Sequence, residues 1–135
     1  MMLEEAAANT RLAAVVSEGA GARVVSEELD DLSGVEKYTG ATVLLTKTAA
    51  LAVFSNEAPP TNLAKLIPRI APRPVFIVNA AHGEVDRKFP EYVAAAREPK
   101  EAWLVPQGGH TGGIDAMPEE YERRVVGFFD RALRS

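Results

Sequence analysis

The sequence of 135 residues contains no cysteine, only two histidines and no excess of positive charge. The absence of cysteine excludes disulfide bonds and thiolate metal sites, and two histidines do not supply the ligands of a zinc cage. The net charge of −4 at pH 7 lacks the basic footprint of a nucleic-acid-binding surface. We therefore expect no metal, no cofactor and no nucleic-acid partner.

A secretory leader and a long apolar run are also missing. The first residues, Met1 to Glu5, are acidic where a signal peptide carries positive charge. The longest apolar stretch, Ala41 to Phe54, is interrupted by Lys47 and is too short to span a bilayer. These features predict a cytoplasmic protein, unless a targeting segment lies upstream of this sequence.

What the sequence does contain is an alternation of short apolar runs with helix-like segments. Apolar residues make up 47% of the chain, which is enough for a packed core. Continuous apolar runs indicate strands that are buried on both faces. The predicted strands are 12–16, 75–78 and 102–105, and the predicted helices beside them are 1–9, 63–70, 89–96 and 118–133. This order predicts an α/β fold with three parallel strands and flanking helices.

The segment 39–70 lies between the first two predicted strands and is rich in Ala, Thr and Leu. We interpret it as a helical crossover or a lid-like insertion over a site, with a simple packing helix as the alternative. The chain starts abruptly, because Met1 already resembles the interior of a helix and no capping residue precedes it. We therefore expect residues 1–135 to form a single, incomplete domain that lacks an upstream part.

Two loops that follow neighbouring predicted strands carry acid and base side chains. His110 lies in the run Gly-Gly-His-Thr-Gly-Gly, where the glycines leave the imidazole uncrowded. Asp86 follows the preceding strand, and loops after parallel strands open at the same edge of a sheet. A carboxylate that accepts the imidazole Nδ1–H fixes the tautomer of a general base. Glu18, after the first strand, either lines the same cleft or hydrogen-bonds to a loop, and we interpret His82 as structural.

From residue 12 onward the chain resembles the C-terminal half of an α/β-hydrolase, of the dienelactone-hydrolase-like and peptidase-like bacterial esterases. The motifs that carry this resemblance are AVVSEGA (14–20), AVFSN (52–56) with APP (58–60), IAPRPVF (70–76), HGEVD (82–86), PQGGHTGG (106–113) and PEEYERRVVGFF (118–129). The resemblance implies that the three strands are the last three of the family's sheet. It also implies that His110 is the catalytic base and Asp86 the acid, with Glu84 as the fallback acid.

The nucleophile elbow of that family, G-x-S-x-G, does not occur in this sequence. It should lie upstream of the first predicted strand, and residues 1–8 resemble the helix that follows it. Ser17 is a candidate substitute, because it precedes Asp86 and His110 in the order of the triad and Gly19 follows it. Against Ser17, Val15 stands where the elbow has a glycine, and a polar residue at a strand end is the competing interpretation.

The sequence thus predicts the C-terminal portion of a serine hydrolase that acts on carboxylic esters or similar acyl bonds. Acid and base cannot form an acyl-enzyme without a nucleophile, so we expect this chain alone to be inactive. A non-catalytic α/β binding module and one half of a split hydrolase are the alternatives. The expected partners are a small-molecule ester for the complete enzyme and a second copy at the exposed edge of the first strand.

Overall fold

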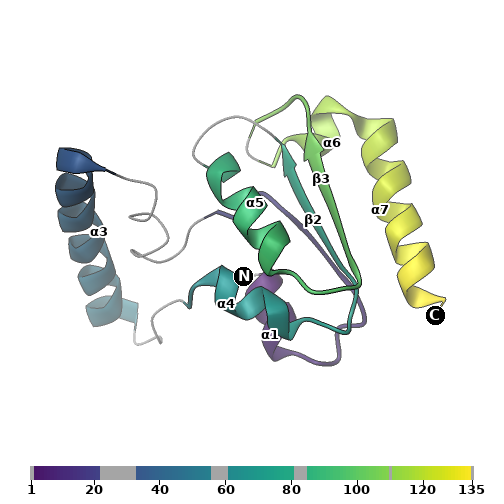
Figure 1. The fold of residues 1–135 in the computed structure, drawn as a ribbon, viewed down its shortest axis with the longest axis horizontal. Coiled ribbons are helices and arrows are strands. Elements are labelled where there is room, and N and C mark those ends of the chain that lie inside the picture. Colours follow the sequence, from purple (N-terminus) through teal and green to yellow (C-terminus); the bar gives the residue numbers. More distant parts are fainter. Residues whose placement is uncertain (1, 22–32, 56–60, 81–84, 110, 135) are drawn as a thin grey trace. The chain divides into compact units, whose positions relative to one another are not determined.

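The structure, a computed structural model, describes residues 2–21, 33–55, 61–80, 85–109 and 111–134 (Figure 1). The chain divides into two compact units, Met1–Gly21 with Leu63–Ser135, and Ala22–Asn62. The second unit contains one described helix, α3 (Gly34–Ser55), and the first contains the other described helices and strands. The first unit therefore holds the sheet at which the site is expected.

The first unit is built on a parallel sheet in the order β1-β2-β3. The strands are β1 (Val15–Glu18), β2 (Val75–Ala80) and β3 (Lys100–Val105). Val15 pairs with Val75, and Val75 pairs in turn with Lys100. The prediction of three parallel strands in an α/β arrangement is confirmed, with β2 in the centre and β1 at one edge.

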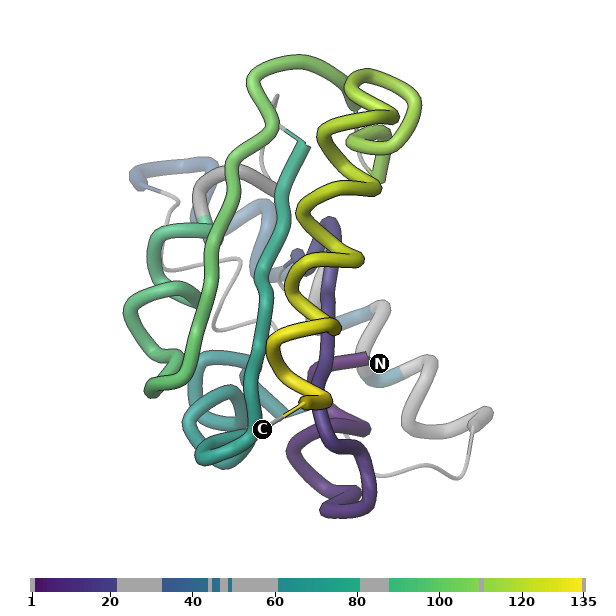
Figure 2. Tube along the Cα trace, turned by 90° about the vertical axis from the view of Figure 1, so that its right-hand side faces the viewer, coloured from purple at the N-terminus to yellow at the C-terminus, as the bar shows by residue number. Residues whose placement is uncertain are grey.

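Helices cover both faces of this sheet, and Figure 2 shows α5 and α7 on opposite sides of the strands. The helical elements are α1 (Met2–Ala8), α4 (Leu63–Leu66), η1 (Ile67–Arg69), α5 (Val85–Ala95), α6 (Gly113–Ala116) and α7 (Pro118–Leu133). Successive residues of a strand point to opposite faces, so Val75 and Ile77 enter one core while Phe76 and Val78 enter the other. All six residues of β2 are buried, which explains its continuous apolar run.

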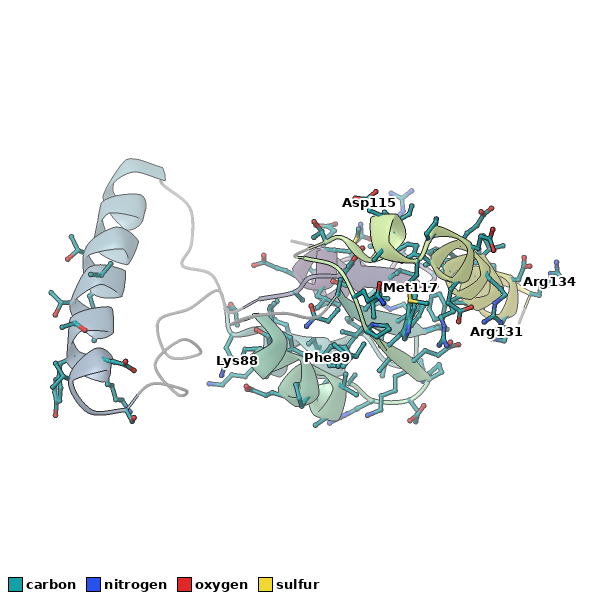
Figure 3. The ribbon with its side chains drawn as sticks, turned by 90° about the horizontal axis from the view of Figure 1, so that it is seen from above. Lys88, Phe89, Asp115, Met117, Arg131 and Arg134 are labelled. Atoms are coloured by element: carbon teal, nitrogen blue, oxygen red, sulfur yellow. The ribbon has the colours of Figure 1, made fainter. Side chains whose placement is uncertain are left out.

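The two cores have different helical partners. The α5-side core contains Leu3, Ala6, Val15, Leu63, Leu66, Ile67, Ile70, Val75, Ile77, Tyr92 and Ala96. The α7-side core contains Phe76, Val78, Ala80, Trp103, Val105 and Phe128. In the latter the rings of Phe76 and Phe128 lie 5.5 Å apart. Met117, between α6 and α7, packs against the same core (Figure 3).

The helix predicted over 118–133 is confirmed at both ends. The helical spacing of its apolar residues also predicts one core-facing stripe, which is partly wrong; it comprises Tyr121, Val125, Phe128, Phe129, Ala132 and Leu133. Phe128 is buried, and Tyr121, Val125 and Phe129 pack against the α7-side core. Leu133, in the last turn, is 61% exposed and does not reach the core. Helical spacing alone does not show where the sheet beneath a helix ends.

The first strand begins later than the sequence predicts, at residue 15 instead of 12. Arg73 explains the difference, since its Nη1 atom binds the carbonyl oxygens of Asn9 at 2.8 Å and Leu12 at 3.3 Å. Pairing with β2 then continues through Ser17 and Glu18, which pair with Ile77 and Val78. Ser17 and Glu18 are therefore parts of the strand and do not lie beyond its end.

Helix α5 begins at Val85, four residues before the predicted start at residue 89. Pro90 consequently lies inside the helix, where its missing N–H removes one backbone hydrogen bond. The helix continues beyond Pro90, and Tyr92 in its second half is buried in the α5-side core. Asp86, predicted in a loop, lies instead in the first turn of α5.

Residues 39–70, which we interpreted as a crossover or lid, are divided between the two compact units. The first part of this segment is helical as expected, although α3 starts earlier, at Gly34. Leu63, Leu66 and Ile67 are buried in the α5-side core, so the last part belongs to the first unit. A lid-like role for the remaining segment stays a prediction.

Candidate functional site

The carboxyl ends of β2 and β3 lie side by side. Their last residues, Ala80 and Val105, are paired in register, so the segments that follow both strands leave from the same edge of the sheet. His82, Glu84 and His110 lie outside the described residues, and so does the side chain of Asp86. The shared edge is the feature that the acid–base prediction requires, while the contact between Asp86 and His110 stays a prediction.

After β3, a backbone hydrogen bond joins Gly109 and Gly112. The amide of Gly112 donates a 2.8 Å hydrogen bond to the carbonyl oxygen of Gly109. Gly108 has a φ of +115°, and Thr111 has a φ of +56°. A β-branched residue in the left-handed region is strained, and such strain persists only where neighbouring contacts hold it. Thr111 is therefore the strained residue of this turn.

Glu18, the last residue of β1, supplies such a contact. Its Oε1 atom accepts a hydrogen bond of 2.7 Å from the amide of Gly113, the residue at which α6 begins. Its Oε2 atom accepts a hydrogen bond of 2.8 Å from the hydroxyl group of Tyr121 on α7. Of the two roles that the sequence left open for Glu18, the structure shows the hydrogen bond to a loop.

Tyr121 is a site residue that the sequence reasoning missed, because it was assigned only to the apolar stripe of α7. Burial, followed by the hydrogen bond and the charge of Glu18, raises the pKa of the Tyr121 phenol to about 12. Its ring also lies 6.1 Å from that of Trp103 in the α7-side core. A tyrosine on the core-facing side of a helix needs a partner for its hydroxyl group, and this requirement was the available signal.

Ser17, the candidate substitute nucleophile, lies inside β1 and is buried, with 6% exposure. A nucleophile elbow places its serine in the sharp turn after a strand. Ser17 instead pairs with Ile77 in the sheet, and its side chain points to the face opposite that of Glu18. This placement differs from that of an elbow serine.

The described residues contain no group of three or more His, Asp or Glu side chains arranged to bind a metal ion. None of the helices in the described part of the chain is both long enough and apolar enough to cross a membrane.

Comparison with known proteins identifies a solved structure whose fold is similar to that of this chain. No family model matches this chain. The uncharacterized protein PA2218 of Pseudomonas aeruginosa is 40% identical over 70 residues, which are 50% of this chain and 18% of that protein. The crystal structure of the hypothetical protein PA2218 from the same organism superposes with a TM-score of 0.64 at 21% identity, and the match covers 96% of this chain and 56% of the other. The chain thus spans about half the length of that structure and is similar to it in fold.

Proposed function

We propose that this chain is the acid- and base-bearing portion of a serine α/β-hydrolase acting on carboxylic esters or similar acyl bonds. In this proposal His110 is the general base, and Asp86 orients and stabilises its imidazolium form. The nucleophile comes from chain that this sequence does not contain. The 135-residue chain alone is then unable to form an acyl-enzyme.

The observation that carries the proposal is the register between Ala80 and Val105 at the ends of neighbouring parallel strands. Ligands of open parallel sheets bind at the carboxyl ends of the strands. Asp86 follows β2 by six residues and His110 follows β3 by five, counted along the sequence. This order, acid first and base second, agrees with the α/β-hydrolase triad.

The edge position of β1 also supports the proposal. The amides of Val15 and Gly19 donate hydrogen bonds to Pro74 and Val78, both at 3.1 Å. The alternation along a strand directs the backbone groups of Val16 and Glu18 to the opposite edge. A further parallel strand carrying the nucleophile could pair there, beside the carboxyl edge that leads to Asp86 and His110.

The test begins with the DNA upstream of Met1, read in frame. We expect an apolar strand followed by G-x-S-x-G within about ten codons of Met1. A chain extended to include that segment should react with a fluorophosphonate at the new serine and hydrolyse p-nitrophenyl esters. The 135-residue chain should show neither reaction.

Matched variants of the extended chain then assign the roles. His110→Ala should lower kcat by about 10⁴-fold or more, while His82→Ala should leave it near the parent value. Asp86→Asn should lower kcat strongly, and Glu84→Gln should not; the reverse result would move the acid to Glu84. An extended chain without the motif and without labelling, or labelling of Ser17 in the 135-residue chain, would overturn the proposal.

A further inference from the structure

Glu18 connects three elements that are far apart in the sequence. Its carboxylate stands at the end of β1, receives the Gly113 amide at the start of α6 and receives the Tyr121 hydroxyl group from α7. Each oxygen has a different partner, so the carboxylate is fixed at both oxygen atoms. Both hydrogen bonds have good lengths, at 2.7 and 2.8 Å.

The contact with Gly113 leaves no room for a side chain at that position. A Cβ atom on Gly113 would lie 2.7 Å from Oε1 of Glu18 and 3.2 Å from the ring of Tyr121. The glycine therefore allows the carboxylate to approach the backbone directly. Gly112 is also closely packed, because a Cβ atom there would lie 3.0 Å from the amide nitrogen of Gly109.

The strained residue of the turn, Thr111, directly precedes these two glycines. Thr111, with its φ of +56°, is preceded in sequence by His110 and followed by Gly112, whose amide closes the turn onto Gly109. The next amide, that of Gly113, is the one that Glu18 binds. A hydrogen bond two residues beyond Thr111 thus ties the end of the turn to β1.

We propose that Glu18 is a positioning residue, whose carboxylate fixes the turn that carries His110 by binding the Gly113 amide and the Tyr121 hydroxyl group together. Glu18 acts through the backbone of the turn and makes no contact with substrate in this role. Because it gives His110 the task of base, this role rests on the proposed function.

The experiment uses backbone NMR relaxation on the 135-residue chain and four variants. In Glu18→Ala the order parameters of Thr111 and Gly112 should fall from the rigid range near 0.85 to below about 0.6, while those of Ile77 and Val78 in β2 stay unchanged. Hydrogen exchange at Gly113 should accelerate by about tenfold or more. Glu101→Ala, which removes an exposed carboxylate bound to Arg131 at 2.8 Å, is the matched control and should leave the turn unchanged.

A conservative variant separates positioning from bulk stability. In Glu18→Gln the amide oxygen can still accept the Gly113 N–H, and the amide nitrogen can donate to the Tyr121 oxygen, so the turn should regain its order. The imidazole resonances of His110 should move in Glu18→Ala and return in Glu18→Gln. The resonances of His82, the other histidine, should remain constant and serve as an internal reference.

A second variant keeps the inference testable if Glu18→Ala does not fold. Tyr121→Phe removes one of the two donors to Glu18, so hydrogen exchange at Gly113 should accelerate and the order of Thr111 should fall relative to the parent chain. A Gly113 amide that does not respond, or a turn that stays equally ordered in a folded Glu18→Ala chain, would overturn the positioning role. None of these readouts needs activity, so they distinguish failure of this role from failure of the proposed hydrolase function.

Discussion

Arg73 binds the carbonyl oxygen of Ala6 through its Nη2 atom at 2.6 Å, across 67 residues of sequence. The same guanidinium binds the carbonyl oxygens of Asn9 and Leu12, so it caps the end of α1 and fixes the segment that leads into β1. A positive charge at a helix C-terminus also interacts favourably with the helix dipole. Lys100 caps α5 in the same way, with its Nζ atom 2.8 Å from two carbonyl oxygens of that helix end.

Replacing Arg73 with alanine should lower the free energy of unfolding by about 2–3 kcal/mol, because several backbone carbonyls lose a charged donor. Arg73→Lys should restore part of this loss, since an ammonium group lacks the planar fork that reaches several acceptors. Arg69→Ala, at an exposed position nearby, is the control and should change stability by no more than about 0.5 kcal/mol. Urea unfolding measures all three, and equal effects at positions 69 and 73 would contradict the capping role.

Tyr121 should make stability depend on pH in the alkaline range. Its folded-state pKa of about 12 lies above the ordinary value of 10.0 for tyrosine, so the folded chain binds the phenol proton more tightly. The resulting stabilisation is complete below pH about 10 and is lost as the pH rises toward about 12. Urea unfolding at several alkaline pH values should show this decline in the parent but not in Tyr121→Phe.

Glu18→Gln should lower the pKa of Tyr121, because it removes the negative charge that opposes the phenolate. Burial, the first cause of the raised pKa, remains in this variant, so the value should stay above 10.0. The phenolate absorbance of the parent minus that of Tyr121→Phe isolates this titration. If the titration of Tyr121, isolated in this way, is unchanged in Glu18→Gln, the contact between Glu18 and Tyr121 is contradicted.

Two glycines should respond in opposite ways to alanine. Gly127 lies in the middle of α7, where a Cβ atom would meet only the end of the long Arg131 side chain at 3.2 Å, so Gly127→Ala should stabilise the chain by about 0.4–1 kcal/mol. Gly113→Ala places its Cβ atom against Glu18 and should destabilise by about 1–3 kcal/mol. Thermal unfolding of both variants tests this prediction. A change in stability of the same sign for both variants would be inconsistent with the structure.

Phe128 is the buried residue of α7 that joins this helix to β2. Phe128→Ala should lower the free energy of unfolding by about 3–5 kcal/mol, since it leaves a cavity against Phe76. Val126→Ala, at a position 52% exposed on the same helix, should change it by no more than about 0.5 kcal/mol. The comparison by urea unfolding shows whether α7 is held by its sheet-facing side.

The edge strand β1 should promote self-association of the 14.5 kDa chain. Its outer backbone groups, at Val16 and Glu18, offer hydrogen bonds to a further strand. Light scattering should show a mass that increases with concentration, and Val16→Pro, which removes an outward amide, should reduce it more than Val16→Ala. A constant monomer mass at all concentrations would disprove this prediction.

The contrast between predicted and observed elements has physical causes. The strand at Val75 and the helix from Pro118 to Leu133 were predictable, because burial on two faces and an apolar stripe leave clear patterns. The start of α5 was not, because proline is typical of a first helical turn, whereas Pro90 lies inside this helix. The late start of β1 depended on Arg73, which lies 61 residues beyond Leu12.

The sequence by itself determined the α/β class, the order of strands and helices, and the placement of acid and base candidates after neighbouring strands. These features follow from local periodicity and from the rule that the loops after parallel strands leave from the same edge of the sheet. Only the tertiary structure decided that Glu18 turns toward Gly113 and Tyr121, and that Ser17 points to the opposite face. Such contacts join residues about 100 positions apart, and the partner of a carboxylate at that distance leaves no trace in local spacing.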